Sequence, residues 1–326
     1  MDMQSTRNTP YRVGFLLLDG FALMSYSSAI EPLRAANLLS DAPLYSIRNL
    51  PGHSASAVSS SGAMIRADTF IGERVDFDLL IVVAGGDPVS VEHPRLFEWL
   101  RLLASRGVMI GGVSGGPVIL AKAGLMQQRR MTVHWEHAQA LSLVSPQVVI
   151  ERTLYVMDRD RMTCAGGTAA LDMMHALISK QHGADFARKV SDWFLHTDIR
   201  PSEGPQRSGL AERYKVNDRI VLMAIELMEN HIADPLELDQ LARIVGVSAR
   251  QLNRLFAEKL NVSTVRFYRS LRLEKARELL QQTTLNLAEI SSATGFANSA
   301  HFSRRFSVQY KRPPSTFRRP VGFKVN

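Results

Sequence analysis

The chain has 326 residues, of which 45% are hydrophobic and 21% are charged, a composition typical of folded domains and not of disordered chains. Its length exceeds what one hydrophobic core usually organises, so we expect two or three domains. No apolar run reaches the roughly 18 residues of a membrane helix. Residues 1–12 are polar and lack a signal-peptide core, which predicts a cytoplasmic protein. The single cysteine, Cys164, excludes an intramolecular disulfide.

The positive charge is concentrated in the last third of the chain. Lys and Arg number 19 against 19 Asp and Glu in residues 1–200, but 20 against 12 in residues 201–326 and 16 against 4 from Arg243 onward. An excess of this kind neutralises phosphates and steers association with nucleic acid. A solvated basic face is the alternative interpretation of the same charge.

The first 195 residues alternate apolar runs with helical patterns, which predicts a mostly parallel sheet covered by helices on both faces. We expect buried strands over residues 13–18, 77–83 and 108–113. Helices are expected to carry Ile30 and Leu33 and to span residues 118–123. The carboxyl ends of the strands in such a sheet form the usual binding crevice.

Glycine-rich turns follow two of these strands. The second strand ends at Gly85 and Gly86, where the backbone can approach a ligand closely. The third strand runs into residues 112–116, GVSGG, which fit the G-x-S-x-G pattern of a strand-to-helix elbow. Such an elbow displays one side chain, here Ser114, and the backbone N–H groups beside it at Gly115 could hold an anion or a carboxylate.

Residues 132–137, TVHWEH, carry a second group of candidate ligand contacts. His134 could contact a ligand or be a structural hydrogen-bonding residue, and Trp135 could offer a π face to a cation or belong to the core. Glu136 could supply negative charge. We expect no metal and no other cofactor, because the remaining histidines of this region lack a metal-ligand spacing: His137, His175, His182 and His196.

These segments together resemble the PfpI/ThiJ-type, class I glutamine amidotransferase-like domain of the GlxA-like branch of AraC regulators, over residues 11–195. The resemblance implies a flavodoxin-like, doubly wound α/β fold. In the enzymatic relatives a cysteine stands at the elbow and a histidine at the position of His134, whereas here the elbow holds Ser114, a weaker nucleophile. The difference favours a ligand sensor without catalysis. Its pocket would be lined by Gly85, Gly86, Ser114, Gly115, His134, Trp135 and Glu136.

Two alternatives stay open for this domain. Ser114 and His134 could form a serine-hydrolase triad with Glu31, Glu136 or Asp172, giving a hydrolase or amidase fused to a DNA-binding domain. The domain could also be an assembly module that binds no ligand.

The resemblance itself implies an effector such as an amino acid, an amine or a quaternary ammonium compound. It also implies a homodimer, for which the apolar residues 170–178 offer a surface.

The first domain is expected to end at a flexible linker. Two prolines and two glycines interrupt any helical pattern within residues 200–209, and we place the linker at residues 196–215. Downstream we expect a helix capped by Asn217 and a longer helix that begins after Ser263.

Residues 238–259 and 287–310 repeat one pattern, about 49 residues apart. In each copy a short amphipathic helix ends at a glycine able to adopt positive φ, Gly246 or Gly295, and a polar residue then caps a second helix rich in Arg, Asn and Ser. This is a helix-turn-helix motif, which lays its second helix in the DNA major groove. Two such helices about 34 Å apart would enter successive grooves on one face of the DNA.

Residues 263–280 and 313–319 resemble the AraC/XylS family of transcription regulators, and we place an all-α DNA-binding domain at residues 216–320. The resemblance implies an activator that works with RNA polymerase. Asn261 and Lys311 stand where the family usually has glycine, and a left-handed Lys311 should cost about 1 kcal/mol. Which side chains contact bases and which contact phosphates stays open. The residues presented to DNA would be Ser248, Arg250, Gln251, Arg254, Asn298, Ser299, His301 and Arg304.

Overall fold

The computed structural model describes residues 9–73, 76–207, 209–283 and 285–318. Residues 1–8 of the polar N-terminal stretch, Ser208 of the predicted linker, and Arg319 and Pro320 at the end of the predicted DNA-binding domain lie outside the described residues. The chain divides into two compact units, residues 1–206 and residues 207–326.

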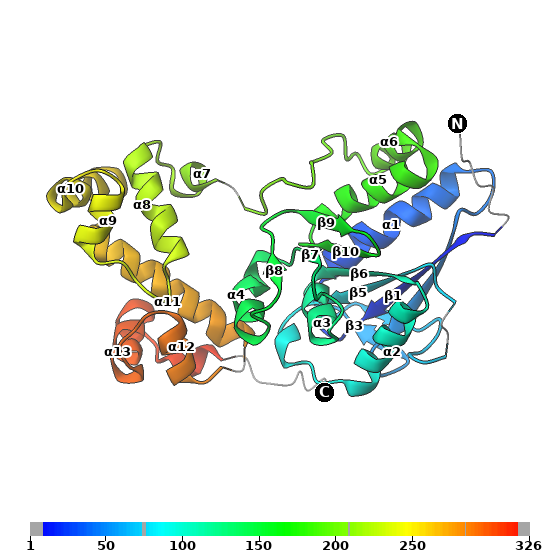
Figure 1. Cartoon of the computed structure of the whole chain (residues 1–326), viewed down its shortest axis with the longest axis horizontal. Helices are drawn as coiled ribbons and strands as arrows, with labels where there is room; N and C mark the ends of the chain where they lie inside the picture. The colour runs from blue at the N-terminus through cyan, green and yellow to red at the C-terminus, as the bar shows by residue number, and fades with distance from the viewer. Residues whose placement is uncertain (1–8, 74–75, 208, 284, 319–326) are drawn as a thin grey trace. The chain divides into compact units, whose positions relative to one another are not determined.

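The first unit alternates strands with helices (Figure 1). The strands of its main sheet are β1 (Tyr11–Leu17), β2 (Tyr45–Pro51), β5 (Leu79–Ala84), β6 (Met109–Ser114), β9 (Tyr155–Asp158) and β10 (Arg161–Cys164). Two small sheets pair β3 (Ser56–Val58) with β4 (Met64–Arg66) and β7 (Arg130–Met131) with β8 (Val149–Ile150). The helices are α1 (Leu23–Leu39), the 3-10 turn η1 (Pro88–Ser90), α2 (Pro94–Ser105), α3 (Gly116–Lys122), α4 (Trp135–Val144), α5 (Ala169–His182) and α6 (Ala184–Trp193).

The main sheet has the strand order β2-β1-β5-β6-β10-β9 and is parallel except for the β10–β9 pair. This confirms the predicted flavodoxin-like α/β fold with a mostly parallel sheet. The three expected strands are β1, β5 and β6. The edge strands β2 and β9 were not expected, because their sequences, YSIRNLP and YVMD, mix polar with apolar residues and lack a clear alternation.

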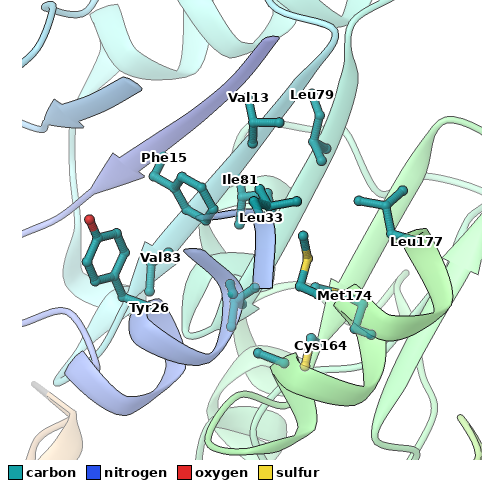
Figure 2. Close-up of a cluster of buried hydrophobic side chains, with 14 of the residues drawn as sticks. Val13, Phe15, Tyr26, Leu33, Leu79, Ile81, Val83, Cys164, Met174 and Leu177 are labelled. Atoms are coloured by element: carbon teal, nitrogen blue, oxygen red, sulfur yellow. The ribbon is translucent and has the colours of Figure 1, made fainter. Parts of the chain in front are cut away.

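The core of this unit forms two layers, because successive residues of a strand face opposite sides of a sheet. Phe15 of β1 and Ile81 of β5 pack against α1, α5 and α6, and Figure 2 shows this layer with Met174 and Leu177 from α5. Leu80 and Val82 face the other way, toward α2 and α3.

The prediction of a dimer surface at residues 170–178 is wrong, since Ala170, Leu177 and Ile178 of α5 are buried in the first layer.

The second unit is helical, as expected. Its elements are α7 (Leu210–Tyr214), α8 (Arg219–Asn230), α9 (Leu238–Ile244), α10 (Ala249–Leu260), α11 (Thr264–Gln282), α12 (Leu287–Ala293), α13 (Ser299–Tyr310) and the 3-10 turn η2 (Pro314–Phe317). Asp218, and not the predicted Asn217, caps α8, because its carboxylate accepts the Val221 N–H at 3.0 Å. The long helix α11 begins directly after Ser263, as predicted.

Two helix-turn-helix motifs are formed by α9 with α10 and by α12 with α13. Gly246 and Gly295 have φ values of +80° and +68°, so each turn uses the conformation that only glycine adopts without strain. Asn261 and Lys311 end the second helices in the left-handed conformation, at φ +54° and +58°, as their positions predict.

The helix α11 connects the cores of the two motifs. Phe267 and Tyr268, near its start, pack in the core of the first motif, and Leu273, Ala276 and Leu279 pack in the core of the second. One continuous helix therefore contributes to both cores. Its stiffness fixes the two motifs relative to each other within this unit.

Candidate functional site

The elbow after β6 has the strained geometry that its sequence predicts. Ser114 has a φ of +60°, an uncommon conformation for a residue with a Cβ, and it is buried. The glycines around it are required by close packing. A Cβ on Gly116 would lie 2.0 Å from the Val82 carbonyl oxygen, and a Cβ on Gly112 would lie 2.7 Å from the Pro117 nitrogen. The turn is therefore held by backbone packed against backbone.

Residues from distant parts of the sequence surround Ser114. The Ser25 hydroxyl of α1 accepts the Gly167 N–H at 2.7 Å, and a Cβ on Gly166 would lie 2.6 Å from Ser25 Oγ and 2.8 Å from Ser114 Cβ. Within the described part of the chain, no group forms a hydrogen bond with the Ser114 hydroxyl. Sequence reasoning missed Ser25, Gly166 and Gly167, because only the tertiary fold brings these loops together.

His134 stands beside the elbow, where the sequence places it. Its backbone N–H donates to the Ser114 carbonyl oxygen at 3.3 Å. Its Nδ1 accepts the Glu136 N–H at 3.4 Å, so the side chain caps α4. Burial lowers the pKa of His134 below its usual value, which keeps the imidazole neutral at pH 7. The ring of Trp135 lies next to that of His134, with 5.2 Å between the ring centroids.

The three acidic residues that could complete a hydrolase triad either pair with other residues or lie too far from His134 Nδ1 for a hydrogen bond. Asp172 is fully buried and accepts hydrogen bonds from Arg200 and His196. Glu31 pairs with Arg34 on the exposed side of α1, at 2.7 Å. Glu136 lies 3.7 Å from His134 Nδ1. No hydrogen bond joins the side chains of Ser114 and His134 in the described residues, so the geometry of a charge-relay triad is not assembled.

Glu136, His134 and His137 could each direct one ligand atom to a common point, since these atoms all lie within 4.8 Å of one another. The spacing of these residues in the sequence did not suggest this grouping. His134 Nδ1 already accepts the Glu136 N–H, and a metal bound through that atom would have to replace the cap of α4.

The glycines predicted to line the pocket have packing roles of their own. A Cβ on Gly85 would lie 2.6 Å from the Gly20 carbonyl oxygen, and Gly86 has a φ of +65°. The Gly115 N–H donates to the Ala84 carbonyl oxygen at 3.0 Å. That amide is therefore already engaged, contrary to the expectation that it is open to a ligand carboxylate.

Cys164 does not replace the elbow nucleophile. It is fully buried in β10, where burial raises the pKa of its thiol to about 12, and its sulfur accepts the Gly166 N–H at 3.3 Å. A thiol that stays protonated and out of contact with water is a poor nucleophile.

The side chains predicted to contact DNA lie on α10 and α13 or at their N-termini. Arg250, Gln251, Arg254 and Arg304 are exposed, whereas Ser299 and His301 are partly buried. Ser248 and Asn298 have a second role, because they cap the two helices: Ser248 Oγ accepts the Gln251 N–H at 3.2 Å, and Asn298 Oδ1 accepts the His301 N–H at 2.8 Å.

Arg272 of α11 shows that the basic residues of this unit do not all face solvent. Its Nε donates to the Thr294 carbonyl oxygen at 2.8 Å, its Nη2 donates to Gly295, and its guanidinium lies 4.3 Å from the Phe296 ring centroid. Arg272 therefore stabilises the turn of the second motif.

Comparison with known proteins assigns both units. Residues 11–180 match the DJ-1/PfpI family, and residues 241–320 match a family described as a helix-turn-helix domain. The HTH-type transcriptional regulator GlxA of Rhizobium meliloti (strain 1021) is 43% identical over 99% of this chain and 100% of its own. The regulator CdhR of Pseudomonas aeruginosa is 40% identical over 95% of this chain and 92% of its own. The crystal structure of an AraC family transcriptional regulator from Pseudomonas putida has a TM-score of 0.52 and 30% identity, over 57% of this chain and 100% of its own.

A DJ-1/PfpI-type domain joined to an AraC-type helix-turn-helix domain defines a class of DNA-binding regulators. The chain belongs to the HTH-type transcriptional regulators of the GlxA and CdhR type. Double-stranded DNA is accordingly its partner. Among the described residues, no helix combines the length and the apolar character that crossing a membrane requires.

Proposed function

We propose that this regulator is an activator that senses a small metabolite in its first unit. The sensing domain would occupy residues 11–195 and the DNA-binding domain residues 216–320. The observation that carries the proposal is the Ser114 hydroxyl, displayed by a strained elbow yet without a hydrogen-bond partner in the described residues. Strain of this kind is retained where the surrounding structure holds it for a function.

The effector would be an amino acid, an amine or a quaternary ammonium compound. Trp135 offers a π face to a cation, Glu136 offers negative charge, and the neutral His134 and the Ser114 hydroxyl offer hydrogen bonds. Gly86, beside which a Cβ would meet nothing within 4 Å, would let the backbone approach the ligand, whereas Gly85 and Gly115 would shape the site through their packing. The group of Glu136 with His134 and His137 supports charge recognition equally well, and we propose a site without a metal.

The activator would act as a homodimer with RNA polymerase at its promoters. Its DNA contacts would come from Arg250, Gln251, Arg254 and Arg304, with Ser299 and His301 at the edge of the surface. Ser248 and Asn298 would act at the helix N-termini, where backbone N–H groups favour phosphate. Sedimentation of the protein with and without operator DNA tests the dimer, and a monomer in both would remove it.

We propose that the first unit has no catalytic activity. A hydrolase would need a base at Ser114 and an acid behind His134, whereas Asp172 is committed to Arg200 and His196. Turnover of a chromogenic ester or of glutamine, abolished in Ser114→Ala, would overturn this part of the proposal.

Thermal-shift measurements on the full chain test metabolite sensing directly. Glycine betaine, carnitine and arginine are suitable probes, and a ligand at 100 times its Kd should stabilise the protein by roughly 2.7 kcal/mol. The shift should be lost in Trp135→Ala and in Ser114→Ala. An equal shift in both variants would place the site elsewhere, and no shift with any small amine or amino acid would favour a domain that serves assembly alone.

A further inference from the structure

Residues 196–206, which the sequence predicts to be part of a flexible linker, pack against the first unit. We call this segment the strap. The Ser202 carbonyl oxygen accepts the Leu154 N–H at 2.9 Å, and a Cβ on Gly204 would lie 2.8 Å from the Leu154 side chain. The first unit ends at Gln206, the last residue of the strap, and the second unit begins with the next residue. The strap is therefore the covalent route between the two units.

The first anchor of the strap is Asp172 at the start of α5. Arg200 donates from its backbone N–H and its Nε to this carboxylate, each at 3.0 Å, and from its Nη2 at 2.6 Å. His196 Nε2 lies 2.8 Å from the same carboxylate. Because Asp172 is fully buried, these partners supply the charge compensation that a buried carboxylate needs.

The second anchor is Gln206. Its Nε2 donates to the carbonyl oxygens of Thr153 and Val133, at 2.7 and 3.1 Å, and lies 3.0 Å from Thr132 Oγ1. Two carbonyl oxygens can only accept, so the amide nitrogen must face them. A carboxylate at position 206 would meet those oxygens without a proton to share.

Both anchors adjoin the elbow. Arg200 Nη2 also donates to Thr168 Oγ1 at 2.9 Å, and Thr168 directly follows Gly166 and Gly167, which pack against Ser114 and Ser25. Val133, held by Gln206, directly precedes His134, whose N–H bonds the Ser114 carbonyl oxygen. The strap is thus hydrogen-bonded to both loops that border Ser114: Arg200 contacts the loop of Gly166 and Gly167, and Gln206 contacts the loop of His134.

We infer that Arg200 and Gln206 are positioning residues that couple the effector pocket to the segment leading into the DNA-binding unit. The inference rests on the proposed sensing function. A ligand that shifts the His134 loop or the Gly166–Gly167 turn changes the hydrogen bonds of the strap, and the strap sets how the chain leaves the first unit. Coupling of this kind is reciprocal, so loosening the strap must also loosen the pocket loops.

Amide hydrogen exchange on the ligand-free, full-length protein tests this reciprocity. In Gln206→Glu, which keeps the length of the side chain and removes its donors, amides of residues 132–137 should exchange at least tenfold faster than in the wild type. In His134→Ala, amides of the strap should accelerate in turn. Amides of β5 should be unchanged in both variants. Glu203→Gln, an exposed change within the strap, is the matched control and should leave all three regions unchanged.

Rates within twofold of the wild type at residues 132–137 in Gln206→Glu, or in the strap in His134→Ala, would overturn the inference. If Gln206→Glu accelerated exchange in β5 as well, Gln206→Met would provide the same comparison without the added charge. Failure of the sensing proposal is seen separately, as the absence of any thermal shift with glycine betaine, carnitine or arginine. Where one of these probes binds, Gln206→Glu should bind it more weakly and lose the transcriptional response at saturating probe, whereas Gln206→Asn, which keeps a donor, should recover part of the response.

Discussion

Four of the side chains proposed to contact DNA, those of Arg250, Gln251, Arg254 and Arg304, are exposed on α10 and α13. In the first unit, by contrast, Ser114, Ser25 and Gly166 are buried. Arg254 and Arg304 can be substituted without leaving a cavity in a hydrophobic core, because the cores contain Phe256 and Phe302 from the opposite faces of those helices. At the elbow, the residues that would shape a pocket also hold the sheet and helices together. Binding and stability should therefore be separable in the second unit and entangled in the first.

The largest effect expected from this difference is that of Gly116→Ala. A Cβ at this position would lie 2.0 Å from the Val82 carbonyl oxygen of β5, and neither backbone can give way. We expect the first unit to lose about 4 kcal/mol or more of unfolding free energy, measured by denaturant unfolding of the full chain. Gly62→Ala, at a positive φ but with nothing within 4 Å, should cost only about 1 kcal/mol. Equal losses in the two variants would show that the elbow is not crowded.

Arg304→Ala and Arg254→Ala test the other side of the comparison. Each should weaken operator binding by about 1–3 kcal/mol and reduce its salt dependence if a phosphate contact is lost. The melting temperature should stay unchanged, since both side chains are exposed. Arg272→Ala is the contrasting control, because it removes bonds to Thr294 and Gly295 and should destabilise the second motif. Unchanged operator affinity in both exposed variants would contradict the assignment of the recognition surface.

The sequence could predict those features that depend on neighbouring residues of the chain, and not those that depend on distant ones. The helix-turn-helix units are local patterns, so their glycines, the Ser248 cap and the left-handed Asn261 and Lys311 follow from short-range rules, and the one displaced cap, at Asp218, lies a single residue away. The elbow is also local and was predicted.

The rest of the candidate site depends on long-range contacts. Ser25 meets Gly167 across 142 residues, and Gln206 meets Val133 across 73. No rule of sequence spacing connects such pairs. The Pro and Gly content of the strap predicts a flexible linker when only neighbouring residues are considered. The hydrogen bonds that hold the strap come from partners that only the folded sheet supplies.

Substitutions of Ser114 sharpen the comparison within the first unit. Ser114→Val should cost about 1–2 kcal/mol of stability, because a β-branched side chain is poorly tolerated at positive φ. Ser114→Ala keeps the Cβ and removes a hydroxyl that bonds no group in the described residues, so it should change stability by less than about 0.5 kcal/mol. Unfolding curves of the two variants measure the difference. If Ser114→Ala were as destabilising as Ser114→Val, the hydroxyl would have a structural role and the pocket would lose its principal support.

The smallest expected effect is the pH dependence of the first unit. Burial lowers the pKa of His134, His175 and His182 below the usual value of 6.5. Above pH 6.5 these side chains are neutral whether the chain is folded or unfolded, so they impose no penalty on folding there. As the pH falls from 6.5 toward the lowered values, the unfolded chain takes up protons that the folded chain does not. Stability should therefore decline in that window and level off below it.

Melting temperatures between pH 8 and pH 5 measure this decline, and His134→Gln should flatten part of it.

The second unit should respond differently once DNA is bound. Burial and the neighbouring Arg305 and Arg304 lower the pKa of His301 in the free protein, whereas phosphates placed beside it would raise that pKa again. Operator affinity should therefore increase as the pH falls through the same window in which the first unit loses stability. An operator affinity that does not rise over this window would mean that His301 lies away from the DNA phosphates.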